Sequence, residues 1–212
     1  MDTVTQVTGR HWITRLTPGS LATTLRLPDG GTVEHLRLRW VDADPAGLAL
    51  GEPTVTAVPP FDLVRSDATA ADGSTVARLE MTVRHGDAQP PTGIPECPTL
   101  PRSQHSRRFV VCAEEVDQHL DEVQSVLVTP PARATRDGGM PLPLVPTTLL
   151  VQIVAAPALS RSAGEVEGWF LQTVPVGALV LTCEHPDGLI DLRLAGRDDS
   201  AVILRVAASA AT

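Results

Sequence analysis

Gln152 is the only strongly polar side chain in the apolar run from Leu149 to Ala156. A buried amide without a partner costs roughly 1–3 kcal/mol, so the fold must give Gln152 a hydrogen bond. Two partners fit: a backbone group across a helix–helix or strand contact, or a bound substrate. Thr147 and Thr148 precede this run at the expected start of a helix, where backbone N–H groups and the helix dipole favour an oxyanion on a carbonyl. These three residues are candidates for holding a carbonyl group, but none of them supplies a proton acceptor.

Histidine and cysteine residues offer further chemistry. Cys183 and His185 alternate along an expected strand and so share one face, which makes a Cys/His dyad one interpretation. In the other, Cys183 is a core residue and His185 opens the turn Pro186-Asp187-Gly188. His119 stands among carboxylates on an expected helix, a pattern typical of a solvated face. The remaining histidines have no metal-ligand spacing, so the sequence predicts no metal site and no cofactor.

The composition limits the classes of protein that such residues can serve. The chain has 212 residues with 17 basic and 25 acidic groups, a net charge of −8 that argues against a nucleic-acid partner. All of the basic residues are Arg, and Lys, Asn and Tyr are absent, as in a GC-rich coding sequence. Arginine abundance is therefore not evidence of function. With 42% hydrophobic residues but 3% aromatic ones, the core must be aliphatic.

The compartment is predicted from the cysteines and the first residues. The three cysteines have no CxxC spacing, and the start of the chain has neither a basic nor an apolar run, which indicates a reduced, cytoplasmic protein. The longest apolar stretch, Leu142 to Leu159, is interrupted by prolines and polar residues and falls short of the ~20 apolar residues of a membrane span. The sequence thus predicts no membrane anchor.

A proline-rich segment divides the chain into a β-rich half at residues 1–86, a linker at 87–107 and a second half at 108–212. No long helix is predicted before residue 110. The first half begins with a hairpin of Leu21–Leu27 and Val33–Val41 around a Pro-Asp-Gly-Gly turn. Further strands are expected at Thr54–Val58, Phe61–Ala68 and Val76–Val83.

The second half mixes helices and strands. Apolar residues at 116, 120 and 123 predict a short amphipathic helix. The segment Pro146–Ala156, opened by Pro at its first position and closed by Pro157, predicts a helix that is apolar nearly all round and so buried. Strands follow at Trp169–Val176, Ala178–Glu184, Leu189–Ala195 and Ala201–Ala207. An antiparallel meander that covers a buried helix makes an α+β domain.

The stretch MPLPLVPTTLLVQIVAA at residues 140–156 resembles the hotdog-fold β-hydroxyacyl dehydratases and enoyl hydratases, whose corresponding loop reads roughly H-F-P-G-x-P-x-x-P-G. In that superfamily the loop leads into a central helix around which the sheet is rolled. Pro143 and Pro146 match the second and third prolines, and Thr147 stands in place of the glycine. The resemblance implies that Gly138, Gly139, Pro146, Thr147 and Thr148 bind substrate.

The expected acid and base of this superfamily are replaced. The resemblance puts the catalytic histidine eight residues before Pro146, at Gly138, and the catalytic carboxylate at Gln152. Neither glycine nor glutamine titrates, whereas dehydration needs a base for the α-proton and an acid for the leaving hydroxyl. The second half is therefore not expected to be an ordinary dehydratase.

A weaker similarity lies in the first half. The sequence Asp42-Ala43-Asp44-Pro45-Ala46-Gly47 is similar to the D-x-D-P-A-G turn of hydroxybenzoyl-CoA-type thioesterases, also hotdog proteins, and this implies a catalytic Asp44. The alternative is an ordinary acidic turn, because Asp, Pro, Ala and Gly are common turn residues. The helix that should follow this motif is replaced by a predicted strand.

These observations predict an α+β hotdog fold, with the first half a candidate for a degenerate second hotdog packed edge to edge with the other. The expected function is that of a dehydratase-like protein, a lyase acting on acyl thioesters of acyl carrier protein or CoA in a bacterial polyketide or fatty-acid-like pathway. Such an enzyme would use Gln152, Asp44 or His185. Two alternatives stay open: a thioesterase, or a non-catalytic subunit that completes a partner's channel. A β-rich binding protein without thioester chemistry is the third. Single hotdogs pair, so a homodimer or a heterodimer with another hotdog protein is expected.

Overall fold

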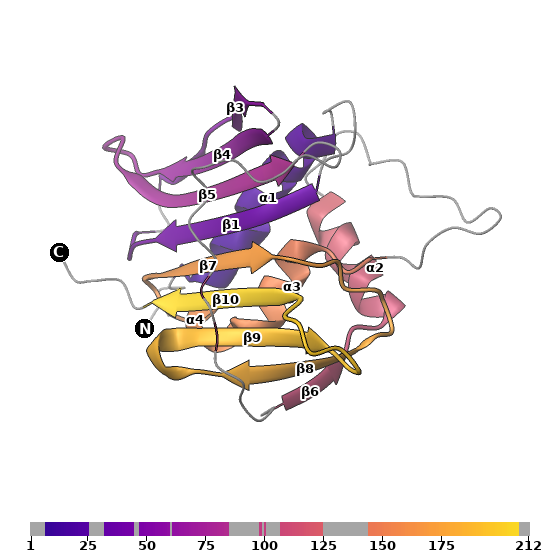
Figure 1. The fold of residues 1–212 in the computed structure, drawn as a ribbon. Helices are drawn as coiled ribbons and strands as arrows, with labels where there is room; N and C mark the ends of the chain where they lie inside the picture. The colour runs from indigo at the N-terminus through magenta and orange to yellow at the C-terminus, as the bar shows by residue number, and fades with distance from the viewer. Residues whose placement is uncertain are drawn as a thin grey trace.

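The computed structural model describes residues 7–25, 32–44, 47–59, 61–84, 98, 100, 107–124 and 144–207. One ten-stranded sheet carries the helices α1, α3 and α4 on one of its faces (Figure 1). The elements are, in chain order, α1 (Gly9–Leu25), β1 (Thr32–Trp40), β2 (Ala49–Leu50), β3 (Thr54–Val58), β4 (Phe61–Thr69), β5 (Thr75–Arg84), β6 (Arg107–Val110), α2 (Ala113–Gln124), α3 (Thr147–Val154), α4 (Ala156–Leu159), β7 (Gly164–Phe170), β8 (Leu179–Glu184), the single turn η1 (Pro186–Gly188), β9 (Leu189–Leu194) and β10 (Val202–Ala207).

The sheet repeats one arrangement on either side of its central pair, β1 and β7. Its order is β2-β4-β5-β1-β7-β10-β9-β8-β6, with β3 also paired to β4. Outward from the centre, β1 is followed by β5 and β4, and β7 is followed by β10 and β9. Each central strand comes directly after a helical segment, α1 before β1 and α3–α4 before β7. That the first half is a degenerate second hotdog packed edge to edge with the other stays a prediction.

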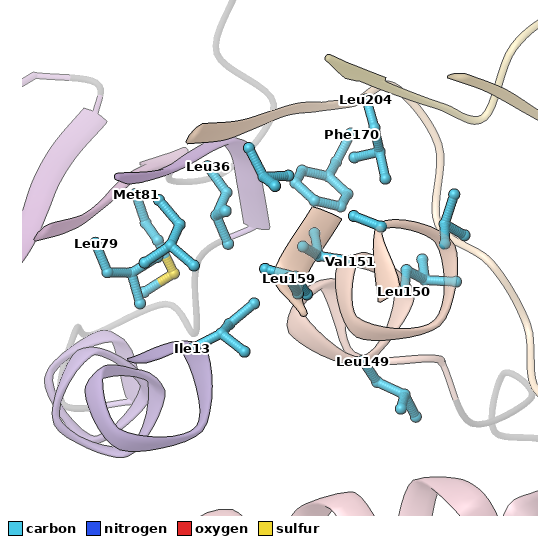
Figure 2. Close-up of a cluster of buried hydrophobic side chains, with 14 of the residues drawn as sticks. Ile13, Leu36, Leu79, Met81, Leu149, Leu150, Val151, Leu159, Phe170 and Leu204 are labelled. Atoms are coloured by element: carbon cyan, nitrogen blue, oxygen red, sulfur yellow. The ribbon is translucent and has the colours of Figure 1, made fainter. Parts of the chain in front are cut away.

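A continuous core lies between the sheet and the helices. Alternation along β1 turns Leu36, Leu38 and Trp40 toward the helices, where each is at most 2% exposed. Figure 2 shows Leu150 and Val151 of α3 beneath Phe170 of β7 and Leu204 of β10. The segment opened by Pro146 is thus a buried helix under the sheet, as its composition predicted.

Ion pairs join the two central strands on the opposite face of the sheet. The carboxylate of Glu165 on β7 lies 2.5 Å from Arg37 and 2.9 Å from Arg39 on β1. His35 Nε2 lies 3.1 Å from Glu167 Oε1, and both side chains are buried. Arg205 of β10 contacts the other oxygen of Glu167 at 3.2 Å. These ion pairs and the buried contact between His35 and Glu167 therefore bind the two halves of the sheet at their seam.

The first helix corrects the prediction for the start of the chain. α1 runs from Gly9 to Leu25, so the expectations of no long helix before residue 110 and of a strand beginning at Leu21 are wrong. The adjacent Pro18-Gly19 interrupts the helical pattern in the sequence, but packing against β4 and β5 outweighs its low helix propensity. The buried side chains of α1 recur on one helix face: Trp12, Ile13, Leu16 and Thr17.

The predicted helix Pro146–Ala156 is two helices. Pro146 is the N-cap of α3 rather than its first helical residue, and α3 ends at Val154. Pro157 lies in the first turn of α4 instead of closing a helix. Proline has no N–H and its ring clashes with the carbonyl four residues earlier, so one continuous helix cannot pass through this position.

The strands of the second half differ from the prediction in one respect. The strand expected at Trp169–Val176 is β7 at Gly164–Phe170, and it pairs with β1 and β10 rather than with β8. Two glycines in GEVEGWF hide its alternation, which the buried Val166 and Phe170 nevertheless follow. The helix at Ala113–Gln124 and the strands predicted near β1, β3, β4, β5, β8, β9 and β10 are confirmed. Most of the predicted linker lies outside the described residues, and the division into domains stays a prediction.

Candidate functional site

A cavity of about 410 Å³ opens where α3 begins. It lies between the start of β1, the end of β5 and the chain that follows β7, so both halves of the sheet contribute to it. Its wall is formed by Val33, Glu34, Arg84, Leu144, Val145, Pro146, Thr147, Leu150, Phe170, Leu171, Gln172, Thr173 and Val174.

The N-terminus of α3 forms one end of this cavity. Pro146 is the N-cap, with φ −58° and ψ 137°, and no side chain caps the helix there. The first turn closes with the Leu150 N–H donating to the Pro146 carbonyl at 3.1 Å, so the N–H groups of Thr147, Thr148 and Leu149 precede the helix ladder. Such groups, together with the helix dipole, attract negative charge. Thr147 brings this end of the helix into the cavity wall.

An ion pair stands in the same wall. Arg84 Nε donates to Glu34 Oε1 across 2.7 Å, and the two side chains are 28% and 17% exposed. Glu34 sits at a β-bulge, because Val33 pairs with Val83 and His35 pairs with Thr82, so that Glu34 has no counterpart on β5. A bulge of this kind redirects a side chain at the end of a strand. Among the described lining residues Glu34 is the one carboxylate and Arg84 the one cation.

The remaining wall is mainly apolar. Val145, Leu150, Phe170 and Val174 are buried core residues that form the inner surface, and Leu171 is 50% exposed. Gln172 is held in place by hydrogen bonds with Asp199 and Arg197. The cavity therefore combines apolar walls with a polar end made by a helix N-terminus and an ion pair.

Of the predicted substrate-binding residues, Pro146 and Thr147 line this cavity. Thr148 is 1% exposed, and its Oγ1 lies 2.9 Å from His119 Nε2 of α2. Gly138 and Gly139 lie outside the described residues. Substrate binding by any of these residues stays a prediction.

The three predicted catalytic residues do not share this cavity. Gln152 Nε2 donates to Thr14 Oγ1 of α1 at 3.4 Å. This is a contact across two helices, but with a side-chain hydroxyl rather than with the backbone group that was expected. Asp44 is exposed and follows the C-terminal end of β1, whereas Glu34 stands at the other end of that strand. The structure does not bring Gln152, Asp44 and His185 to one place, and a role for any of them in catalysis stays a prediction.

His185 lines a second cavity, of about 250 Å³, below the end of α3 and α4. Arg107, Arg161 and Glu184 stand in the same wall, together with apolar residues of α4 and β9. Cys183 is buried, and its Sγ lies 3.8 Å from the Glu184 carbonyl.

Sequence reasoning missed three residues near the site: Glu34, Arg84 and His119. In the sequence, Glu34 continues the alternation of Leu36, Leu38 and Trp40 toward the N-terminus. A carboxylate at a position where the alternation predicts an apolar residue could have marked Glu34 as a candidate site residue. His119 was expected on a solvated face but is 3% exposed, because it belongs to the buried stripe with Val116. No local pattern marks Arg84, because its role depends on the pairing of β1 with β5.

The opposite end of the β1/β7 pair is filled. There the end of β1 meets the start of β7 and the start of α1. At the cavity, the corresponding elements are the end of β7, the start of β1 and the start of α3. Trp40 occupies this place at 2% exposure. A Cβ on Gly9 would lie 2.5 Å from the Trp40 ring, and one on Gly164 would lie 2.8 Å from it. The indole thus packs directly on two glycine backbones.

The described part of the chain holds neither a cluster of metal ligands nor a helix suited to a membrane. It contains no group of three or more His, Cys, Asp or Glu residues that could hold a metal ion. None of its helices has both the length and the apolar character that a membrane crossing requires.

No protein-family model matches the sequence, and no curated protein matches it. Solved structures do. HtdX from Mycobacterium tuberculosis superposes with a TM-score of 0.61 at 10% identity, covering 96% of this chain and 89% of that one. An acyl-ACP thioesterase from Bacteroides thetaiotaomicron gives 0.56 at 9% identity, covering 94% and 84%. A MaoC-like dehydratase gives 0.55 at 9% identity, covering 93% and 83%. With its helices packed on one face of an antiparallel sheet, the chain has the hotdog fold.

Proposed function

We propose that this protein binds an acyl thioester in the cavity at the start of α3. The thioester carbonyl lies against the N–H groups of the first helical turn, and the acyl chain follows the wall of Leu150, Phe170 and Val174. The observation that carries this proposal is the opening of a helix N-terminus, without a side-chain cap, into an apolar cavity of about 410 Å³. Apolar walls with a few placed polar groups are typical of small-molecule sites.

The reaction proposed for this site is that of a dehydratase, the interconversion of a 3-hydroxyacyl and a 2-enoyl thioester carried by acyl carrier protein or CoA. The similar structures include a dehydratase and an acyl-ACP thioesterase, and this supports a thioester substrate. A polyketide or fatty-acid-like pathway is the proposed setting, because such pathways reduce and dehydrate carrier-bound acyl groups.

A non-catalytic subunit is the second candidate. The positions that match the superfamily's histidine and carboxylate hold Gly138 and Gln152, and the described lining residues include no imidazole. In this role the chain would form a dimer with another hotdog protein that carries the missing acid and base. A thioesterase is a weaker alternative, because its proposed residue Asp44 stands at the far end of β1 from the cavity.

The binding proposal is tested by calorimetry with a thioether analogue of a medium-chain acyl-CoA, which cannot be hydrolysed. Thr147→Pro removes one first-turn N–H and is compatible with the helix, because proline suits the first helical position and Pro146 already has the extended ψ that must precede a proline. We expect Thr147→Pro to weaken binding about tenfold. Thr147→Ala keeps the N–H and serves as the matched control. Absence of binding by the wild-type protein would refute the proposal.

The two candidate roles are separated by turnover. Hydration of a 2-enoyl-CoA by the purified protein alone, measured as the loss of enoyl absorbance, supports the role of an enzyme. Hydration only after addition of a partner hotdog protein supports the subunit.

A further inference from the structure

We propose that Glu34 is the carboxylate that transfers the proton in this site, with Arg84 as the residue that positions it. This inference builds on the proposed binding of an acyl thioester and adds the group that performs the chemistry. In this proposal Glu34, from the first half of the chain, acts on a thioester whose carbonyl is held by α3, from the second half.

Glu34, and not Gln152, lies in the wall of the cavity. The superfamily position for a carboxylate is occupied here by Gln152, and this side chain contacts Thr14 of α1 instead of lining the cavity. Glu34 stands in the wall of the same cavity as Thr147, whose N–H belongs to the first turn of α3. A carboxylate and a helix N-terminus facing one cavity are the two groups that removal of a proton next to a carbonyl requires.

Arg84 and a β-bulge orient the carboxylate of Glu34. The bulge at Glu34 takes this residue out of the pairing between β1 and β5. Arg84 Nε donates a hydrogen bond to Oε1 at 2.7 Å and so holds the carboxylate at the wall of the cavity. In the proposed arrangement Oε2 is the oxygen that meets the substrate. At 17% exposure the carboxylate is mostly shielded from bulk water, so its contacts with a ligand are less screened.

One carboxylate is sufficient for the proposed dehydration, because it gives back the proton that it takes. A 3-hydroxyacyl thioester lies with its carbonyl on the first-turn N–H groups, which stabilise the negative charge that develops on oxygen. Oε2 of Glu34 takes the proton from C2, the electron pair of the broken C2–H bond forms the C2–C3 double bond, and the C3–O bond breaks. The departing hydroxyl takes the same proton back from Glu34 and leaves as water. The products are a 2-enoyl thioester, water and the original carboxylate, and hydration is the reverse sequence.

This assignment distinguishes Glu34 from the other ion-paired carboxylates of the sheet. Glu165 also lies in a strand and binds two arginines, but on the face away from the helices. Its side chain is 26% exposed, similar to that of Glu34, and it does not line the cavity. Glu165→Gln is therefore the matched control for Glu34→Gln.

The test measures exchange of the C2 protons of a bound acyl-CoA with deuterium in D₂O by NMR, together with hydration of a 2-enoyl-CoA. We expect Glu34→Gln to lower both rates at least 100-fold while analogue affinity changes less than threefold, because general acid–base groups contribute about 10²–10⁴ in rate. Glu34→Asp should restore part of the exchange, and Arg84→Gln should lower kcat more than it raises KM. Glu165→Gln should retain both rates.

Each contrary outcome has a distinct meaning. Exchange or hydration that survives Glu34→Gln would overturn the role of Glu34. Analogue binding by the wild-type protein without exchange or hydration would also overturn it, but would leave the binding function in place. Loss of analogue binding in the wild type would remove both proposals.

Discussion

His119 Nε2 of α2 lies 2.9 Å from Thr148 Oγ1 in the first turn of α3, and both side chains are buried. This hydrogen bond joins α2 to the N-terminus of α3, which opens into the cavity. It gives Thr148 a structural partner beside Thr147, which lines the cavity. The position of the first-turn N–H groups therefore depends on a contact between two helices.

Thr148→Val should destabilise the protein by about 1–3 kcal/mol, because it keeps the side-chain volume but removes the partner of a buried imidazole nitrogen. Urea unfolding gives the free energy of unfolding. Thr147→Val, at a less buried position beside it, is the control and should change stability by less than about 0.5 kcal/mol. Equal effects of the two substitutions would contradict a specific role for the His119 contact.

Gln152→Leu should lower the free energy of unfolding by about 0.5–1.5 kcal/mol, because it removes the hydrogen bond to Thr14 Oγ1 between α3 and α1. Thioether-analogue affinity should stay within twofold, since Gln152 does not line the cavity. A large loss of affinity or turnover with unchanged stability would instead support the substrate contact that the sequence suggested for this residue.

Gly164→Ala should destabilise the protein by about 1–3 kcal/mol, because the new Cβ would meet the buried Trp40 ring at 2.8 Å. At Gly51 the same change brings Cβ to an ordinary 3.4 Å from the Asp67 carbonyl, so Gly51→Ala should be near neutral. Thermal unfolding of the two variants makes the comparison. Trp40→Leu in the Gly164→Ala background should destabilise less than in the wild type, and additivity of the two changes would argue against this contact.

Val33→Phe should lower the affinity for the thioether analogue by at least tenfold, because Val33 lines the cavity and a phenyl ring there would occupy the volume proposed for the acyl chain. Calorimetry with analogues of different chain length measures the effect, which should grow with chain length. Val58→Phe adds the same ring at a site that is 41% exposed on β3 and should leave affinity unchanged. A uniform effect at all chain lengths would place the acyl group elsewhere.

Stability should fall as the pH drops from about 7 toward about 5.5 because of His35. Burial lowers the pKa of His35 below its usual value and outweighs the attraction of Glu167, while Arg37 lowers it further and Glu80 opposes. In the unfolded chain His35 takes up a proton near pH 6.5. As the pH falls through this range, the unfolded chain therefore binds more protons than the folded chain, and the free energy of unfolding decreases. Above that range the contribution of His35 is complete.

The test for His35 compares urea midpoints of the wild type and His35→Gln at the two pH values. The wild type should lose more stability between them than the variant. The burial of His11 also lowers its pKa, but this residue is present in both proteins and cancels in the difference. Identical pH dependence in the two proteins would contradict the sign assigned to His35.

Parts of the fold could be predicted because their signals are local. Alternation marked β4 and β5 to within a residue or so, and Ala71-Asp72-Gly73 marked the turn between them, where Gly73 has φ +83°. The apolar composition of residues 146–156 predicted burial of α3. By contrast, Pro18-Gly19 concealed α1, because tertiary packing against β4 and β5 stabilises that helix against the propensity of its own sequence.

The sequence alone determined most of the strands and the burial of the segment that contains α3, because each depends on residues close together in the chain. The tertiary structure decided the composition of the cavity. Glu34 and Arg84 are 50 positions apart and meet only through the register and bulge of β1 on β5. Long-range strand pairing also placed Trp40 at one end of the central pair and left the other end open, which no local pattern encodes.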